Sequence, residues 1–389
     1  MKSTSARSLY RSLSPWAQAA LIAATGALSL ARYRALPEAI QDQASALPTA
    51  ARSPLVSIIV PARNEQRHLP TLLPSLLQQD YPAIEVIVVD DASTDATGDI
   101  AAEWAARDPR LRVIRGHGPP PGWTGKNAAC WRGAQAARGA WLLFTDADTC
   151  HEPSALRAAL ALAERHHVSA VSLFPRQRCE SFWERLLLPF AYQQYFVGTH
   201  TRALARPDTP ALANGQYFLI SRAAYAASGG HAAIAKSVID DVALAGALKR
   251  AGYPTLVARG EALVSVRMYD SLAALVEGFT KNAAQFTLAQ RGAGALVALS
   301  TAANATTLPA LATSAASGDT VGLAGAVAAW LVQSLALAPW AHGFGARRRY
   351  ALLSPLAGLV FTGIALTSFA HALLRWPVRW KGRALAPAR

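Results

Sequence analysis

The sequence predicts an α/β domain with a mostly parallel sheet and flanking helices, followed by C-terminal transmembrane helices. Between residues 55 and 144, short apolar runs rich in β-branched residues alternate with helical patterns. This alternation is typical of strands that are buried on both faces of a parallel sheet. Three later segments, 293–316, 320–341 and 351–374, are each long and apolar enough to cross a bilayer.

The composition supports a folded chain with a membrane-embedded part. Of the 389 residues, 52% are hydrophobic and only 16% are charged, and the mean hydropathy is +0.18. Such a chain has ample apolar material to bury, which excludes a disordered polar protein. The three cysteines, Cys130, Cys150 and Cys179, are too few and too widely spaced for a disulfide scaffold or a CxxC metal site.

The positive charge lies beside the apolar flanks. Of the net charge of +14, residues 1–52 contribute +4, residues 342–389 contribute +8, and the long segment between them only +2. A nearly neutral middle disfavours nucleic-acid binding. Basic residues at the ends of apolar segments instead indicate anchoring at an anionic membrane surface.

The same pattern divides the chain into four parts. Residues 1–52 are predicted to form a membrane anchor or interfacial helix with a linker, 53–290 the α/β domain, 291–374 the transmembrane helices, and 375–389 a basic tail. The uncharged run 16–31 is short for a membrane span, so a signal peptide is an alternative to an anchor.

The orientation of the apolar segments stays open. Helices buried in a soluble core are the alternative, but three such runs rimmed by Arg and Trp disfavour it. If residues 351–374 cross the membrane, the cluster Arg347–Arg349 and the basic tail lie on opposite sides, against the positive-inside rule. Either one basic cluster is external, or one run is re-entrant or interfacial.

Each element of the α/β domain follows from its local pattern. Apolar runs predict strands, whereas apolar residues spaced by three and four predict helices, as in residues 65–79, where five leucines share one face. The predicted strands are 55–60, 84–89, 111–114 and 141–144, and the predicted helices are 65–79, 95–106 and 126–138.

Polar residues follow three of these strands: Pro61–Glu65, Asp90–Asp95 and Thr145–Asp148. Ligands of such sheets bind at the carboxyl ends of the strands, so chemistry is expected there. The Gly-rich dinucleotide and P-loop fingerprints are absent from the sequence. Asp146 and Asp148, two positions apart after a buried strand, could instead hold a divalent cation that binds a diphosphate. A solvated turn is the alternative for these two residues taken alone.

Four motifs, VSIIVPARNE, VIVVDDASTD, LLFTDADT and VIDDVALAGALKRAGY, together resemble the family 2 glycosyltransferases, which have the GT-A fold. The resemblance covers about residues 55–285. Two further stretches, GPPPGWTGKNAACWRGA and SVRMYDSLAALVEGFTKN, are similar to a narrower group, the membrane-associated glycosyltransferases linked to carotenoid and hopanoid biosynthesis.

The resemblance implies a nucleotide-sugar site. Asp91, with Asp90, is expected to bind the base of a UDP-sugar, and Pro61, Arg63 and Glu65 to frame the base and ribose. A helix-capping loop is the alternative for the acidic pair.

It also implies that Asp146 and Asp148 bind Mg²⁺ or Mn²⁺, which would act as a Lewis acid on the leaving diphosphate. Lys126 and Arg267 are expected diphosphate contacts. A solvated helix start and a structural arginine are the respective alternatives.

The family's acidic dyad corresponds to Asp240 and Asp241, with Asp241 as the expected general base for an inverting single displacement. An acidic pair facing the helix macrodipole is the alternative, and both can hold together. Trp123, Gly215 and Gln216 are the expected acceptor contacts.

Two stretches bear on the acceptor. Residues 182–204 combine aromatic residues with leucines and suggest an amphipathic membrane-interface segment that admits a lipid, with ordinary core packing as the alternative. Processive members of the family carry a QxxRW motif, but the corresponding stretch here, Ser265–Tyr269, does not contain it intact. Transfer of a single sugar is therefore favoured.

We therefore expect a membrane-associated, inverting glycosyltransferase that moves one sugar from a UDP-sugar to the hydroxyl or carboxyl group of a lipid such as a carotenoid, hopanoid or polyprenol. Its expected place is the inner (cytoplasmic) membrane, with the catalytic domain facing the cytoplasm. A processive polysaccharide synthase and an inactive membrane scaffold with a GT-A domain are the alternatives.

Overall fold

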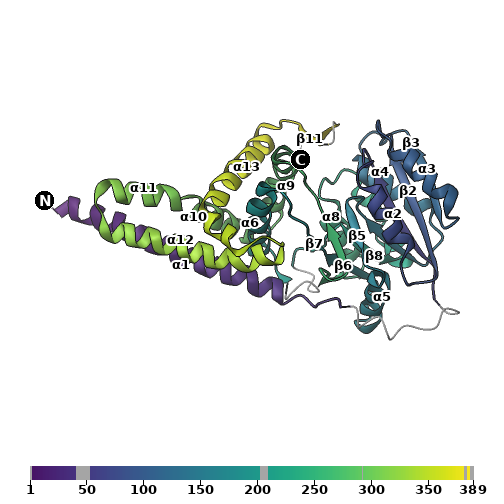
Figure 1. The fold of residues 1–389 in the computed structure, drawn as a ribbon, viewed down its shortest axis with the longest axis horizontal. Helices are drawn as coiled ribbons and strands as arrows, with labels where there is room; N and C mark the ends of the chain where they lie inside the picture. The colour runs from purple at the N-terminus through teal and green to yellow at the C-terminus, as the bar shows by residue number, and fades with distance from the viewer. Residues whose placement is uncertain (1, 41–52, 202–208, 291, 381–382, 386–389) are drawn as a thin grey trace.

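The computed structural model describes residues 2–40, 53–201, 209–290, 292–380 and 383–385 (Figure 1). A sheet domain lies at one end of the elongated molecule, and a helical part extends from it toward the N-terminus.

The sheet domain is built on a seven-stranded mixed sheet with the order β3-β2-β1-β4-β8-β6-β9. The first four strands in this order are parallel, whereas β8 is antiparallel to both of its neighbours. These four confirm the predicted strands. The bounds are β1 Val56–Ala62, β2 Ile84–Asp91, β3 Leu111–Gly116, β4 Trp141–Thr145, β6 Ala170–Phe174, β8 Tyr217–Ser221 and β9 Leu256–Arg259.

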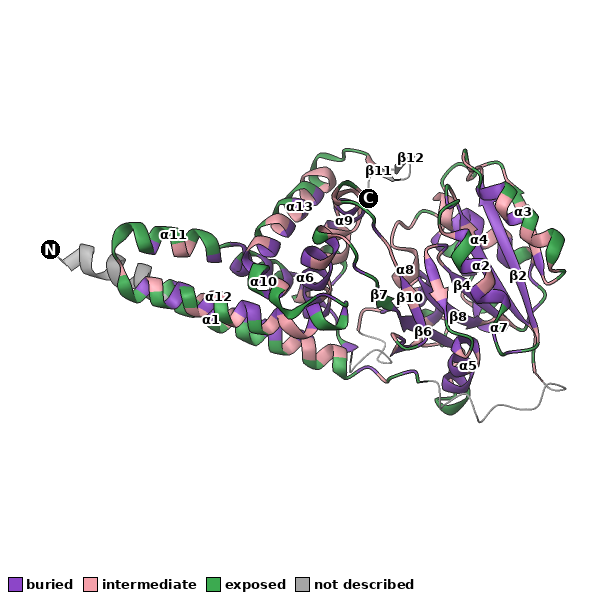
Figure 2. Cartoon of the chain, viewed as in Figure 1, coloured by how far each residue is buried: buried purple, intermediate pink, exposed green. Residues whose placement is uncertain are grey.

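Helices cover both faces of this sheet, because successive side chains of a strand point to opposite faces. On β1, Ile58 and Val60 join one apolar cluster, whereas Ile59 joins another. Figure 2 shows the sheet as buried between its helices. The helices are α2 Leu69–Leu77, α3 Thr97–Arg107, α4 Gly125–Ala136, α5 Ala155–Arg165, α7 Arg222–Ala227, η4 Gly230–Ile234 and α8 Asp240–Arg250. A small sheet of β5 Thr149–His151, β10 Val264–Val266 and β7 Arg176–Gln177 lies beside them.

The packing of α4 on the sheet depends on a glycine. A Cβ atom at Gly133 would lie 2.4 Å from Ile59 Cγ2 and 3.2 Å from Val89 Cγ2. We expect Gly133→Ala to lower the free energy of unfolding by about 1–3 kcal/mol through overpacking. Gly246→Ala on α8, where the nearest atom is 3.5 Å away, is the matched control. Thermal unfolding of the two variants checks this, and an equal melting temperature in both would contradict it.

The remaining helices form an elongated bundle. In the part of the chain that the structure describes, the bundle contains α6 Phe182–Gly198, α9 Leu272–Ala289 and the helices that flank or continue them. These are α1 Lys2–Arg34, α10 Gly292–Ala305, α11 Thr307–Ser317, α12 Thr320–Gly343, η5 Arg348–Leu353 and α13 Ser354–Leu374, followed by the hairpin of β11 Val378–Trp380 and β12 Arg383–Leu385.

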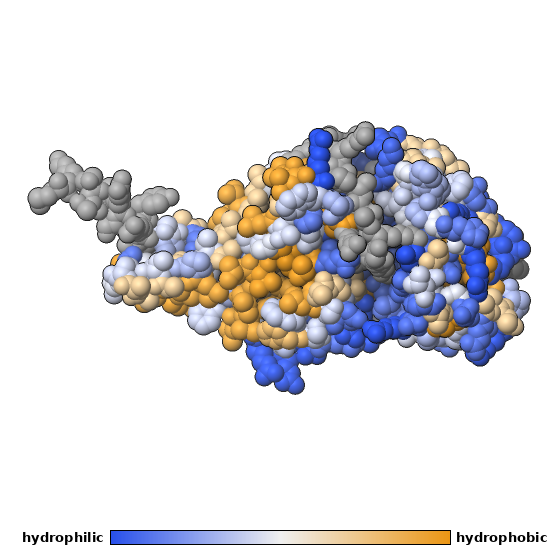
Figure 3. All heavy atoms as spheres, turned by 90° about the horizontal axis from the view of Figure 1, so that it is seen from above, coloured by the Kyte–Doolittle hydropathy of each residue, from blue (hydrophilic) through white to orange (hydrophobic). Residues whose placement is uncertain are grey.

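Two C-terminal helical segments, Thr320–Gly343 and Arg348–Leu374, are long and apolar enough to cross a membrane. The predicted run 293–316 is not one straight helix. Its two helices, α10 and α11, meet at an angle of 42°, which makes them a broken span or a re-entrant loop. Large apolar side chains cover the outside of the bundle, and Leu335 and Leu373 are 74% and 80% exposed. Figure 3 shows an apolar surface over the helices and a hydrophilic one over the sheet domain. Exposed apolar surface of this extent fits membrane association.

The N-terminal run 16–31 is part of α1, which lies along α12 (Figure 1). Small residues allow the close approach: a Cβ at Gly26 would lie 2.6 Å from Ala336 Cβ, and one at Gly325 would lie 2.8 Å from Trp16 Cδ1. Small residues at a helix contact are typical of membrane bundles.

The amphipathic membrane-interface segment predicted for 182–204 is not what α6 forms; the alternative, core packing, agrees with the structure. This helix has buried residues on all sides, among them Leu187, Phe190 and Phe196. It is central because it packs against α1, α10, α12 and α13 at once. The end of the predicted segment, 202–204, lies outside the described residues.

Candidate active site

A cavity of about 1050 Å³ connects the carboxyl ends of the sheet strands with the helical bundle. One end is lined by residues that follow β1, β2 and β4, and the other by apolar residues of α6, α9, α10 and α13. Most of the predicted site residues line it. They are Pro61, Arg63, Glu65, Asp91, Lys126, Asp146, Asp148, Gly215, Gln216, Asp240, Asp241 and Arg267.

Asp90 and Trp123 are not among the lining residues. The side chain of Asp90 accepts a hydrogen bond from the backbone N–H of Ser93 at 3.0 Å, as in the capping alternative. The Trp123 ring lies 5.4 Å from that of Trp131 between ring centroids. Their predicted ligand contacts therefore have no support in this cavity.

Lys126 joins two of the acidic motifs. It lies in the first turn of α4, and its Nζ is 2.7 Å from Asp146 Oδ1 and 3.1 Å from Asp240 Oδ2. Burial lowers the pKa of Lys126, but the two carboxylates outweigh burial and raise it well above its usual value. For the acid Asp240, burial acts in the opposite direction and raises the pKa, but the positive charge of Lys126 lowers it below its usual value. Both groups are thus charged at neutral pH.

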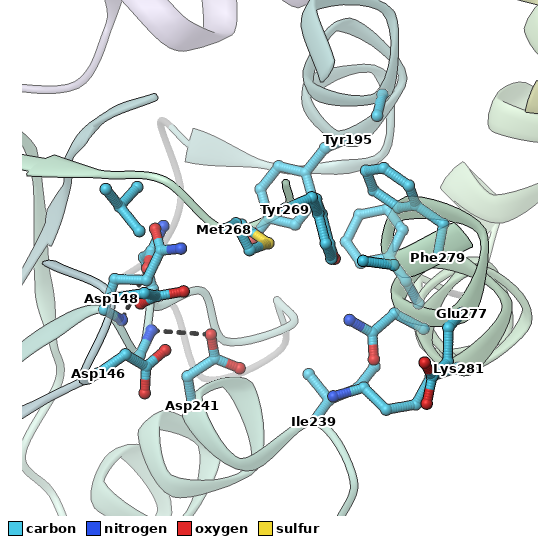
Figure 4. Close-up of a pocket in the computed structure, with 18 of the residues that line it drawn as sticks. Asp146, Asp148, Tyr195, Ile239, Asp241, Met268, Tyr269, Glu277, Phe279 and Lys281 are labelled. Atoms are coloured by element: carbon cyan, nitrogen blue, oxygen red, sulfur yellow. Dashed lines mark hydrogen bonds between the residues drawn. The ribbon is translucent and has the colours of Figure 1, made fainter. Parts of the chain in front are cut away.

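Asp241 has a different environment although it follows Asp240 directly. Its Oδ2 accepts a hydrogen bond from the backbone N–H of Gly215 at 2.9 Å (Figure 4), and its Oδ1 accepts one from Val242 at 2.8 Å. Burial and the negative charge of Asp240 raise the pKa of Asp241 to about 6. A carboxylate with a pKa near the working pH is suited to removing a proton.

Gly215 has no side chain, which allows Asp241 to lie close to the loop that contains Gly215. A Cβ at this position would lie 3.2 Å from Asp241 Cβ and 3.3 Å from Lys126 Nζ. We expect Gly215→Ala to displace both groups and to lower turnover by about tenfold or more, since small shifts of catalytic groups are costly. Steady-state kinetics check this, with thermal unfolding to show that the variant stays folded. Unchanged kinetics would contradict it.

The strand ends near β1 and β2 form the polar end of the cavity. Arg63 donates from Nη1 to the backbone carbonyls of Asp91 and Ala92, at 2.8 Å each. Asp91 Oδ1 lies 3.8 Å from Arg132 Nη1. Glu65 is buried and pairs with His68 at 2.7 Å. The loops after these two strands are therefore tied together around the cavity.

Arg267 has structural partners. Its Nε lies 3.1 Å from Glu184 Oε1 and its Nη1 lies 2.7 Å from Glu180 Oε2. Glu184 is fully buried and completes the capping box that starts α6. Arg267 thereby fixes the loop before α9 to the start of α6, which agrees with the structural alternative.

For several residues that line the cavity, the sequence motifs predict no function. Tyr192 and Tyr195 of α6 and Lys281 and Phe286 of α9 line the cavity. The tyrosines lie in the aromatic stretch that was singled out, but their orientation depends on how α6 packs. Lys281 could have been noticed as the one lysine between residues 250 and 290.

Residues 57–229 match the profile of glycosyl transferase family 2. The match spans 173 of the 389 residues. Two curated relatives are named 4,4'-diaponeurosporenoate glycosyltransferase. The protein of Staphylococcus haemolyticus (strain JCSC1435) is 32% identical over 233 residues, 59% of this chain and 61% of the relative. That of Staphylococcus aureus (strain MRSA252) is 31% identical over 235 residues, 58% and 60% of the two chains. The chain thus matches about three-fifths of the length of these relatives.

The arrangement of the glycosyltransferase domain and its helices is also found in a solved structure. A mannosyltransferase from Pyrobaculum calidifontis, solved with GDP-Man and Mn²⁺, has a TM-score of 0.56 and 21% sequence identity. The match covers 92% of this chain and 99% of the mannosyltransferase. At this identity the likeness shows the fold alone, and it confirms the predicted GT-A architecture.

Proposed function

We propose that the protein transfers one sugar from a nucleotide-sugar donor to a lipid acceptor at a membrane. The observation that carries the proposal is the single cavity that joins the acidic strand ends to the apolar helices. A water-soluble donor and an apolar acceptor need such a site, with one polar end and one end open to lipid-facing helices.

The donor would lie at the polar end. Asp91 and Arg63 would contact the base and ribose, and Lys126 the diphosphate, as the family resemblance implies. A UDP-sugar remains our preferred donor, although the mannosyltransferase of similar fold was solved with GDP-Man. Nucleotide identity is therefore part of the test.

Asp146 and Asp148 would hold a divalent metal ion, Mg²⁺ or Mn²⁺. Both line the cavity two positions apart, and carboxylate oxygens are ligands that these hard cations prefer. Among the residues that the structure describes, no group of three or more His, Cys, Asp or Glu side chains is gathered for a metal. Donor phosphates and water would therefore complete the ligand set, as is usual for Mg²⁺. The mannosyltransferase of similar fold was solved with Mn²⁺. When bound, the metal would act as a Lewis acid on the diphosphate.

The reaction would be a single displacement with inversion. An acceptor oxygen forms a bond to the anomeric carbon while the bond from that carbon to the diphosphate breaks, and the nucleoside diphosphate leaves. If the acceptor is a hydroxyl group, Asp241 takes its proton. If it is a carboxylate, no proton is transferred, and Asp241 serves to orient it.

The acceptor would enter from the bundle. Phe286, Val297, Phe361 and Phe369 line the far end of the cavity and offer an apolar surface to a long chain. The curated relatives carry the name of a carotenoid acid, which makes a carotenoid-type lipid our first candidate. A hopanoid and a polyprenol remain further candidates.

We further propose that the protein lies in the inner membrane with its glycosyltransferase domain in the cytoplasm. The apolar helices and the exposed apolar surface of the bundle support the membrane location.

Transfer assays on the full-length protein in lipid nanodiscs test the function. The protein is incubated with Mn²⁺ or Mg²⁺, a lipid extract and labelled UDP-glucose, UDP-GlcNAc or GDP-mannose. We expect label in a small product that organic solvent extracts. An insoluble polymer would support the polysaccharide synthase instead. Absence of both transfer and donor hydrolysis with every donor would support the inactive scaffold and overturn the proposal.

A further inference from the structure

A lysine lies where the cavity changes from charged to apolar. Lys281 belongs to α9, the helix that leads from the sheet domain into the bundle, and it lines the cavity together with its neighbours Phe279 and Asn282. Figure 4 shows its side chain extending from α9 along the cavity wall toward Ile239, on the side where Asp241 lies.

This position differs from that of Lys126. Lys126 is paired with Asp146 and Asp240 at the donor end. Lys281 lies on α9, and the residues that follow it on this helix, Ala283 and Phe286, line the apolar part of the cavity. An acceptor whose chain occupies the apolar end must place its reacting group near Asp241, whose charge also acts on Lys281.

The charge balance bears on which acceptor can bind. Asp241 and Glu277 line this part of the cavity, whereas Lys126 balances the charge of Asp240. An anionic group brought there from the membrane would be repelled by the two carboxylates that Lys126 does not pair with. A buried charge is tolerated only when it is paired and hydrogen-bonded. A cation at the mouth of the apolar end would provide that pairing.

We propose that Lys281 binds the carboxylate head group of the lipid acceptor and so selects an acid over the corresponding alcohol. The assignment rests on the proposed function, because it presupposes a lipid acceptor in the apolar end. The ammonium group would hold one carboxylate oxygen while the other forms the bond to the anomeric carbon.

The protonation of Lys281 agrees with this role. Burial and the nearby Lys126 lower the pKa of Lys281 to about 8, with Asp240 and Asp146 opposing them. The side chain is therefore still mostly charged at pH 7, and a bound anion would stabilise that charge further.

Binding of a polyene acid and its alcohol tests the proposal. Retinoic acid and retinol are titrated into the full-length protein in nanodiscs, and binding is followed by quenching of tryptophan fluorescence. We expect the wild type to prefer the acid, and Lys281→Met to lose about 10- to 100-fold in affinity for the acid, the range for a hydrogen bond to a charged group. Affinity for retinol should change by no more than about twofold.

Two further variants separate this role from a structural one. Lys281→Arg keeps the charge and should retain the acid preference, whereas Lys236→Met removes an exposed lysine outside the cavity lining and should leave both affinities unchanged. The affinity of each variant for UDP is measured in parallel by calorimetry.

The outcomes are distinct. Equal acid preference in Lys281→Met and wild type would overturn the proposal, as would loss of UDP binding with acid binding intact, which would assign Lys281 to the diphosphate. A wild type that glycosylates lipids without preferring acids would refute only the lysine assignment. A wild type that transfers no sugar to any lipid would refute the proposed function itself.

Discussion

Replacing Asp148 by alanine is expected to abolish metal-dependent donor binding and to lower kcat/KM by about 10³-fold or more, because the metal is worth several kcal/mol of charge stabilisation in the transition state. Asp148 lies at the carboxyl end of β4, next to the carboxylate that Lys126 contacts. Without it, one of the two proposed protein ligands of the metal is lost. Calorimetric titration of UDP with and without Mn²⁺ measures the effect directly.

The matched control for this variant is Asp99→Ala. Asp99 is an exposed aspartate of α3 that pairs with Arg115 at the surface and does not line the cavity. The Asp99→Ala variant should bind UDP with the affinity of the wild type, and Mn²⁺ should increase that affinity by the same factor. If Asp148→Ala also keeps the wild-type UDP affinity and the same dependence on Mn²⁺, the metal role of Asp148 is wrong.

The effect of Asp241→Asn is expected to depend on the acceptor. With a hydroxyl acceptor, loss of the general base should lower turnover by about 10²- to 10⁴-fold. With a carboxylate acceptor no proton has to be removed, so the loss should be far smaller. Comparing retinol with retinoic acid as acceptors for the wild type and the variant gives this ratio. Equal losses with both acceptors would contradict the role of Asp241 as a base.

The same carboxylate predicts a pH dependence. Because the pKa of Asp241 is raised to about 6, the group is protonated below that pH and cannot accept a proton, and it is ionised above it. Transfer to a hydroxyl acceptor should therefore increase as pH rises through about 6. Asp240→Asn removes the neighbouring negative charge, so it should move this rise to lower pH. A profile that is flat from pH 5 to 8 in the wild type would contradict the assignment.

Much of the sheet domain could be predicted because its local patterns agree with its tertiary structure. The runs at 55–60 and 84–89 are buried on both faces in the observed sheet, as unbroken β-branched runs predict. The acidic residues after β4 were found for the same reason, since the end of a buried strand fixes where the next side chains lie. Asp90 and Asp91 could not be told apart in this way. Neighbouring residues point to opposite sides of a strand, and only the structure shows which of the two lines the cavity.

The helical part was harder to predict because apolar composition does not encode how helices pack. The run 293–316 has no charged residue, yet it bends at the junction of α10 and α11. The aromatic pattern of 182–204 suggested a membrane-interface segment, but packing against α1, α10, α12 and α13 buries α6.

The sequence alone determined the α/β class of the sheet domain, the acidic motifs and the association of charge with apolar flanks, because these depend on residues close together in the chain. The tertiary structure decided what those motifs face. It brings Lys126 between Asp146 and Asp240, sets Gly215 against Asp241, and opens the acidic site into the helical bundle through α6 and α9. These contacts join residues more than 20 positions apart or on different elements, and only the packing of the whole chain fixes their distances.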